Sequence, residues 1–589
     1  MQDNKNILLA TMLSMVILLS WTWLYEKPRL EKKEAQRKVL LQKQAAQKSA
    51  NNIATNSTNN LAKEQANFKD VKSPAPQGAV VTLKNRQQIL NENKNSRIVI
   101  QSNELHGSIF LEGARFDDLT LAKYFKENDK KEEVVLFAPS QSKERYFADF
   151  GWISSDSTLD LPTPETVWKA SSQKLTPQNP VNLTWKNKQN IEFIIEVSMD
   201  ENFMFFITQK VKNKSGRDIN ISNYGRINRA IQNLGKPNYI LHEGFLGVFN
   251  DILQEYTYKD SVEDGDQKFD SSGSTWLGIT DKYWLSALIA DKNFDYKSEF
   301  SYKSSNQTNV FNSEFVSQEF KIDKNSEIIF EHKLFAGAKK VKVLDQYSKE
   351  YNIKLFDRAI DFGWFYFLTK PFFFAIDFLY KFLGNFGLAI LAMTVLIKAA
   401  LFPMANKSYK AIAKMKKFQP KIMEIREKFK DDRIAMNREM MEMYKREKVN
   451  PASGCLPILL QIPIFFALYK VIFVTLDMRH APFYGWIKDL SVPDPTSIFN
   501  LFGLLPFEVG GILMIGIWPI LMGITMVLQQ KLSPPVADPT QAKIMKYMPY
   551  VLTFVLASFP SGLVIYWTWS NLLSILQQYY ITRIVNKEK

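Results

Sequence analysis

Apolar residues are distributed so unevenly along the chain that its two parts must fold in different surroundings. Uninterrupted apolar runs concentrate between Phe362 and Ile584, whereas the stretch from Val81 to Lys340 is polar and alternating. The hydrophobic share of 46% over 589 residues hides this division. The division excludes a purely soluble protein, and it excludes a carrier that fills its whole length with membrane helices.

The N-terminal segment from Ile7 to Tyr25 contains 19 residues without a charge. At about 1.5 Å per residue, such a helix crosses an apolar core of about 30 Å. Trp21 and Trp23 lie near its far end, as in an interfacial aromatic belt. A cleaved signal peptide has a shorter apolar part and a small-residue exit. We therefore predict an uncleaved anchor over 1–25, followed by a disordered polar linker over 26–79.

The next region, 80–345, alternates between apolar and polar residues with the period of a β-strand. An example is IEFIIEVSM, from Ile191 to Met199, and turn residues such as Gly216 and Gly235 separate the runs. Many short strands in this length predict a large β-sandwich. The region contains no catalytic motif.

The C-terminal part predicts membrane helices joined by short loops. Residues 352–383 are rich in aromatic residues with interspersed charges, which favours an amphipathic helix lying in the membrane interface, broken or kinked at Pro371. With the anchor, the apolar segments predict an α-helical membrane protein with six transmembrane helices. The five later spans are 384–403, 455–476, 511–530, 546–559 and 563–584.

The charges of the loops set the expected orientation. The loop 404–450 carries 14 Lys and Arg residues, whereas 477–510 carries two. The positive-inside rule therefore places 404–450 in the cytoplasm, together with the loop 531–545, the short tail 585–589 and both termini. The loop 477–510 and the β domain then lie in a periplasm, at a bacterial inner membrane. Basic residues just after the anchor favour the opposite orientation, but long domains are often translocated regardless of such charges.

The loop 404–450 has its own helical pattern. Met415, Phe418, Ile422 and Ile425 are spaced by three and four residues, and a similar run of methionines follows the turn at Asp431. This pattern predicts an antiparallel helical hairpin, although a solvated charged linker is the alternative. We expect its basic face to recruit a ribosome or a targeting receptor, through Lys414, Lys416, Lys417, Lys421, Arg426, Lys430 and Arg433.

No motif for nucleotide binding, hydrolysis or metal binding is present. A single cysteine and four scattered histidines exclude a disulfide framework and offer no ligand spacing. We therefore expect no enzyme activity, no cofactor and no metal. The net charge of +15 favours contact with anionic lipids over nucleic acid, because membrane spans are present.

Lys398, within AILAMTVLIKAALFP, is the most informative single residue. A lysine in a membrane span costs about 3 kcal/mol, so it indicates function unless it snorkels to the nearby cytoplasmic end. Lys470 lies nearer the outer end, where snorkelling is the simpler interpretation. Polar residues that could line one cavity with Lys398 are Thr394, Gln461, Ser570, Asn571, Ser574, Gln577 and Gln578. Helix packing through hydrogen bonds is the alternative for this polar stripe.

Several long motifs resemble those of the YidC/Oxa/Alb membrane protein insertases. They are DFGWFYFLTKPFF (361–373), GNFG (384–387), QPKIMEIREKF (419–429), KVNPASGCLPILLQIPIFFALY (448–469), DP…KIMKYMP (538–549), FPSGLVIYW (559–567) and SNL (570–572). The resemblance covers about residues 355–585. The anchor and the β domain resemble the Gram-negative form of this family by architecture.

This resemblance implies a five-helix insertase core around a hydrophilic groove that opens to the cytoplasm. The family carries one cation in the groove, usually Arg, and Lys398 takes that position here; Thr394, Tyr566 and Trp567 fall at positions that line the groove or touch substrate. It also implies insertion and chaperoning of nascent membrane proteins, alone or with a Sec-type translocon. The stretch 495–511 is longer than in many relatives.

Two other functions fit parts of the sequence. A solute or lipid transporter would usually show internal repeats and charged pairs across its spans, and neither is visible. A membrane-anchored periplasmic enzyme would need a catalytic group of residues that the β domain lacks. The sequence therefore favours an insertase.

Overall fold

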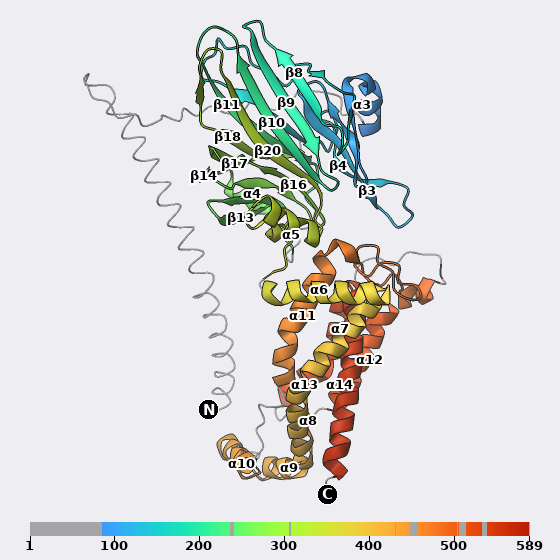
Figure 1. Ribbon diagram of the computed structural model, residues 1–589. Helices are drawn as coiled ribbons and strands as arrows, with labels where there is room; N and C mark the ends of the chain where they lie inside the picture. Colours follow the sequence, from blue (N-terminus) through green and yellow to red (C-terminus); the bar gives the residue numbers. More distant parts are fainter. Residues whose placement is uncertain are drawn as a thin grey trace, which may run out of the picture.

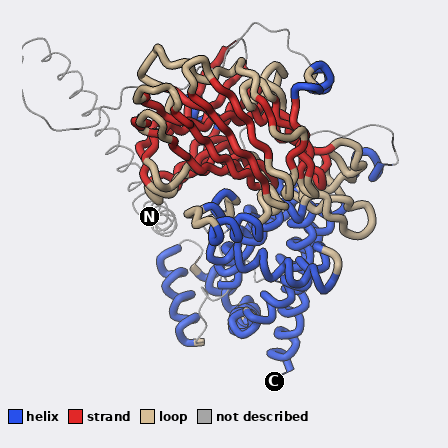
Figure 2. Tube along the Cα trace, turned by 45° about the horizontal axis from the view of Figure 1, so that its top comes forward, coloured by secondary structure: helices blue, strands red, loops and turns tan. Residues whose placement is uncertain are grey.

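The computed structural model describes residues 85–235, 241–305, 308–363, 365–429, 432–447, 456–503, 505, 514–532 and 539–587. The predicted anchor over 1–25 and the linker over 26–79 lie outside these residues. In the described part, a β-rich domain is followed by a helical region that lies to one side of it (Figures 1 and 2). The predictions of a β-rich domain and of a helical C-terminal region are confirmed.

The larger sheet of the β domain has 11 strands in the order β14-β17-β18-β11-β5-β3-β2-β1-β7, with β19 beside β11 and β4 beside β3. Its pairs are antiparallel except that of β1 with β7. The strands are β1 (Arg97–Gln101), β2 (Leu105–Phe110), β3 (Arg115–Phe125), β4 (Glu133–Phe137), β5 (Tyr146–Ile153), β7 (Lys174–Leu175), β11 (Ile219–Ile231), β14 (Gln267–Ser272), β17 (Asp295–Ser305), β18 (Thr308–Ser317) and β19 (Phe320–Ile322).

The second sheet has 9 strands in the order β13-β12-β15-β16-β20-β10-β9-β8-β6. These are β6 (Lys169–Ala170), β8 (Val181–Lys186), β9 (Ile191–Met199), β10 (Met204–Asn213), β12 (Gly244–Phe249), β13 (Ile252–Thr257), β15 (Trp276–Thr280), β16 (Trp284–Ile289) and β20 (Glu327–Ala338). Three short helices accompany the sheets: α3 (Arg86–Glu92), η2 (Lys94–Ser96) and α4 (Tyr258–Asp264).

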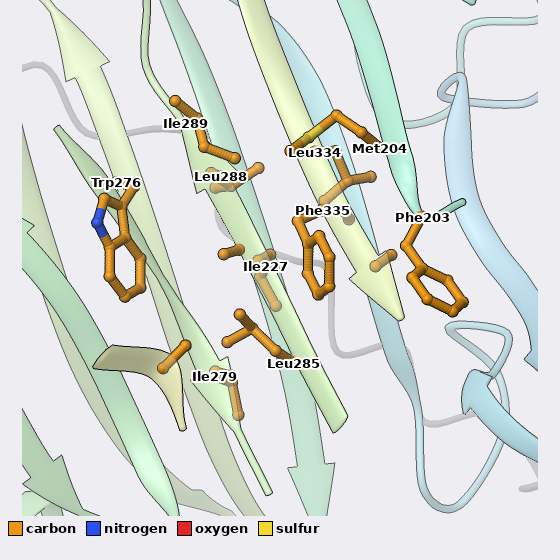
Figure 3. Close-up of a cluster of buried hydrophobic side chains, with 14 of the residues drawn as sticks. Phe203, Met204, Ile227, Trp276, Ile279, Leu285, Leu288, Ile289, Leu334 and Phe335 are labelled. Carbon is orange, nitrogen blue, oxygen red and sulfur yellow. The ribbon is translucent and has the colours of Figure 1, made fainter. Parts of the chain in front are cut away.

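The two sheets pack face to face because alternate side chains point into a shared core. Along β10, buried residues alternate with half-buried ones. Phe205 of β10 meets Phe116 of β3 edge to face at 5.5 Å, and Phe245 of β12 stacks on Phe300 of β17 at 4.7 Å. Figure 3 shows part of this core, with side chains from both sheets turned toward one another. Aromatic and branched side chains in this arrangement supply the main stabilisation of the domain.

The connection to the helical region runs through α5 (Val341–Glu350) and η3 (Phe356–Ala359). Next, α6 (Tyr366–Leu383) lies across the end of the helical region that faces the β domain (Figure 1). The expected break at Pro371 is absent, because α6 runs through it. A proline in the second turn removes one backbone N–H, and the following turns still form their own hydrogen bonds.

The remaining helices form the bundle and the segment that extends from its end. They are α7 (Phe386–Ala400), α8 (Phe402–Lys417), α9 (Gln419–Lys428), α10 (Arg433–Arg446), α11 (Leu456–Val474), α12 (Ile517–Leu532), α13 (Pro539–Leu556) and α14 (Ser561–Lys587), with the short turns η5 (Leu476–Met478) and η6 (Ile498–Gly503). Among the described helices, none by itself combines the length and apolarity of a membrane span; α7 and α8 do so together, across a bend of 68°.

The hairpin predicted over 404–450 differs from the structure in its first arm. This arm is divided at Phe418 into α8 and α9, and Pro420 lies in the first turn of α9. An apolar face of α8, with Tyr409 and Ile412, packs on Ile581 of α14. Only α9 and α10 therefore pair as a hairpin, whereas α8 belongs to the bundle. The sequence pattern continues from α8 into α9, but packing of the apolar face of α8 on α14 separates the two helices.

The β domain and the helical region contact each other directly. Arg479, after η5, donates from Nη2 to the backbone oxygens of Phe125 and Lys126 at 2.6 and 3.0 Å. Lys282 of the β domain lies 3.8 Å from the ring centre of Phe473 at the end of α11. These contacts orient the β domain over the helices.

Candidate functional site

Lys398 lies in the last turn of α7, within the helical bundle. The helix starts where the Asn385 side chain accepts a hydrogen bond from the N–H of Leu388, and it is apolar up to Lys398. The ammonium group donates to Ser574 Oγ of α14 at 2.9 Å and to Gln461 Oε1 of α11 at 3.4 Å. Three helices that are distant in sequence therefore meet at this cation.

The two partners of Lys398 belong to a longer polar chain. The Gln461 amide donates to the hydroxyl of Tyr566, which is buried. The Ser574 hydroxyl donates to the backbone oxygen of Ser570 at 2.9 Å. Donation in this direction leaves the lone pairs of Ser574 free to accept from Lys398. The network holds the ammonium group without neutralising its charge.

A hollow of about 420 Å³ adjoins the cation. Its lining comes from α7, α8 and α14, namely Val395, Lys398, Ala399, Phe402, Leu573 and Gln577. Most of this lining is apolar, and Lys398 and Gln577 supply its polar groups. Within the described ranges, no carboxylate lies within ion-pair distance of Lys398. The arrangement can attract an anionic group from a ligand, because the charge is not already paired.

Lys470, the other lysine in an apolar helix, has a different environment. Its ammonium group lies 2.8 Å from Asp361 Oδ2, near the β domain. The same carboxylate accepts from the backbone N–H groups of His242 and Gly363. Lys470 is thus one member of a contact between the β domain and α11.

The other predicted groove residues divide into two groups. Gln461 and Tyr566 belong to the network of Lys398, and Ser570 enters it through its backbone oxygen. Thr394 is buried and donates to the backbone oxygen of Ile390, and Asn571 donates to Thr525 of α12 at 3.2 Å. Trp567 packs against Phe465 with ring centres 4.7 Å apart. Thr394, Trp567 and Asn571 therefore have structural partners of their own.

Sequence reasoning named one partner of Lys398 without ranking it above its neighbours, and it missed a second residue close to the site. Ser574 stood in the predicted polar stripe, but nothing local marked it as the nearest partner of the lysine. Tyr409 of α8 reaches Ser574 as well, although its sequence position lies in the predicted hairpin. The four-residue spacing from Ser570 to Ser574 was the only available signal.

The residues predicted to recruit a ribosome or targeting receptor are distributed over α8, α9 and α10. The last turn of α8 contains Lys414, Lys416 and Lys417. Positive charges at this end of a helix interact favourably with the helix dipole. Lys421 and Arg426 lie on α9, and Lys421 pairs with Glu447 at 3.6 Å. Arg433 begins α10. Lys430 lies outside the described residues.

Family models cover most of the chain. The model described as 60Kd inner membrane protein matches residues 378–588, and the YidC periplasmic domain model matches residues 97–375. Proteins named membrane protein insertase YidC from Rickettsia bellii and Rickettsia felis are each 47% identical to this chain, over 98% of its length and 99% of theirs.

Solved structures give weaker likenesses. A structure described as an active YidC insertase with its first transmembrane domain resolved covers 82% of this chain and 92% of its own, at 17% identity and a TM-score of 0.35. A galactose mutarotase related enzyme from Lactobacillus acidophilus covers 41% of this chain and 97% of its own, at 10% identity and a TM-score of 0.28.

Proposed function

This chain belongs to the YidC family of membrane protein insertases, proteins of the bacterial inner membrane with a periplasmic domain, and we propose that it inserts its substrates through a groove centred on Lys398. Nascent membrane proteins are the substrates. The observation that carries this proposal is the ammonium group of Lys398, bound by two neutral side chains beside an open hollow.

The proposed mechanism uses charge and hydration rather than bond chemistry. A polar tail of the substrate enters the hollow from the cytoplasm, and its carboxylates interact with Lys398. The amide and hydroxyl groups around the cation lower the desolvation cost of the tail. The apolar segment of the substrate leaves along the lipid-facing side, where burial yields roughly 25 cal/mol per Å². No covalent bond changes, so the activity is not enzymatic.

The membrane arrangement that goes with this mechanism has six spans. The anchor over 1–25, the α7 and α8 pair, and α11, α12, α13 and α14 cross the membrane, whereas α6 lies in the periplasmic interface. Both termini and the α9–α10 hairpin are cytoplasmic, where the hairpin recruits a ribosome or targeting receptor. The protein also works as a chaperone, with or without a Sec-type translocon, and its basic loops contact anionic lipids.

Photocrosslinking to ribosome-bound nascent chains tests the groove. A photoreactive amino acid replaces Gln577, which lines the hollow, and in a matched variant it replaces Leu576, which is 55% exposed on the same helix but does not line the hollow. We expect adducts with the nascent tail from position 577 and fewer from position 576. Equal adducts from both positions, or adducts from neither, would remove the groove from the mechanism.

A further inference from the structure

The loop between α11 and α12 exposes a group of apolar side chains that the insertion mechanism does not use. These side chains, called the apolar tip here, are Ile498, Phe499, Leu501, Phe502 and Leu505, and each is 37 to 53% exposed. The segment 495–511 contains one charged residue, Glu508. Exposed apolar side chains gathered in one short segment indicate a binding partner.

Two residues of the tip have a backbone conformation that is unfavourable for side chains with a Cβ. Leu501 and Phe502 both have positive φ, of 50° and 60°. Side chains with a Cβ rarely adopt this region, and two successive residues do so only when the surrounding structure imposes it. The left-handed turn at these two residues sets the course of the chain at the tip.

A buried carboxylate fixes the base of the tip to the bundle. Asp494, 1% exposed, accepts hydrogen bonds from Trp486 Nε1 and from the backbone N–H of Trp518, both at 3.0 Å. Trp518 lies in the first turn of α12, so the loop is anchored to the head of that helix. In Figure 1 the orange segment before α12 lies at the height of α6. The tip is thus held at a set depth relative to the bundle.

The hydrogen bonds of the tip show which kind of partner it fits. The backbone N–H groups of Phe502 and Leu505 donate to the carbonyls of Ser497 and Asn500, at 2.7 and 3.1 Å, and that of Ile498 donates to Ile515 at 3.1 Å. The N–H of Phe499 donates to Ser497 Oγ at 3.2 Å. Lipid chains offer no hydrogen bonds, so a segment that enters them must satisfy its backbone internally. These four N–H groups are satisfied within the loop, as entry into lipid requires.

We propose that the apolar tip inserts into the periplasmic leaflet of the membrane and fixes the depth of the head of α12. Aromatic and aliphatic side chains without charge are suited to the boundary between head groups and acyl chains. The anchorage through Asp494 transmits that depth to the bundle.

Fluorescence quenching in proteoliposomes of the full-length protein tests this proposal. Cys455, the only cysteine, is replaced by Ser, and an environment-sensitive fluorophore is attached to Phe502→Cys or, as a second variant, to Phe499→Cys. Ile252→Cys, on the exposed face of β13, is the aqueous control, and Val551→Cys on α13 is the control for lipid.

We expect nitroxide-labelled lipids to quench both tip positions strongly, with a nitroxide near the head group more effective than one deep in the chain. Iodide should quench them far less than the label at position 252. Iodide quenching equal to that of the aqueous control would overturn the proposal. Protection from both quenchers would also overturn it, because the tip would then be covered by protein.

Discussion

Removing the charge of Lys398 should impair substrates according to the charge of their tails. The ammonium group has neutral partners, so a substrate carboxylate about 4 Å away would feel its field directly. That interaction is worth about 1 kcal/mol in water and about 4 kcal/mol at the effective dielectric of a protein surface. The hollow is open but mostly lined by apolar side chains. The interaction free energy lost in Lys398→Gln should therefore lie between these two values. The tail's occupancy of the groove then falls roughly 5-fold to several hundred-fold.

The assay compares two substrates that differ only in their translocated tails, one with Asp and one with Asn. Insertion into proteoliposomes is measured by protection of the tail from added protease. Lys398→Gln should slow the Asp substrate within the range above and leave the Asn substrate nearly unchanged. Lys398→Arg should retain insertion of both, because the cation remains, and Lys398→Glu should impair the Asp substrate further.

Lys470→Gln is the matched control, since it removes a lysine from another apolar helix whose charge is already paired with Asp361. Any loss that it causes should be the same for both tails. Equal losses for both substrates in Lys398→Gln would contradict the reasoning, and Lys398 would then have only a structural or hydrating role.

Three further outcomes follow from the structure. Deleting 419–447 removes α9 and α10 but keeps α8 on α14, so insertion of ribosome-bound substrates should fall while thermal unfolding of the purified protein stays unchanged; insertion at the normal rate would exclude the recruitment role. In the β domain, Arg226 forms a buried bidentate pair with Asp149, so Arg226→Met should cost about 3–5 kcal/mol and lower the Tm by roughly 6–20 °C. The double variant Arg226→Met/Asp149→Leu should recover part of that loss in the same thermal scan, because the Glu314 carboxylate, which also acts on Arg226, remains. A single variant without a shift would refute the argument. Burial lowers the pKa of His332 from 6.5 to about 3. As pH falls from about 6.5 to 3, the unfolded state therefore binds a proton that the folded state does not, and the free energy of unfolding decreases. The urea midpoint of His332→Gln should fall less steeply with pH than that of the unchanged protein, and an identical pH dependence would contradict this argument.

The division into a β-rich domain and a helical region was predictable because it rests on local patterns. Alternation along β9 and β10 and the apolar runs of α7 and α11 are properties of consecutive residues. Helix bounds were less predictable. Most of the expected span 546–559 lies within α13, which runs from Pro539 to Leu556 and so begins before the apolar run and ends three residues before 559.

The sequence by itself also marked Lys398, because a charge within an apolar run is a one-dimensional signal. Only the tertiary structure decided what surrounds it. Gln461 and Ser574 lie 63 and 176 positions away along the chain, and their approach depends on how α7, α11 and α14 cross. The partner of α8 was likewise decided by the tertiary structure. Its apolar residues are compatible with a hairpin seam and with the surface of α14, and in the structure they pack on α14. Periodicity fixes which face of a helix is apolar, whereas the identity of the surface that covers this face is a property of the whole fold.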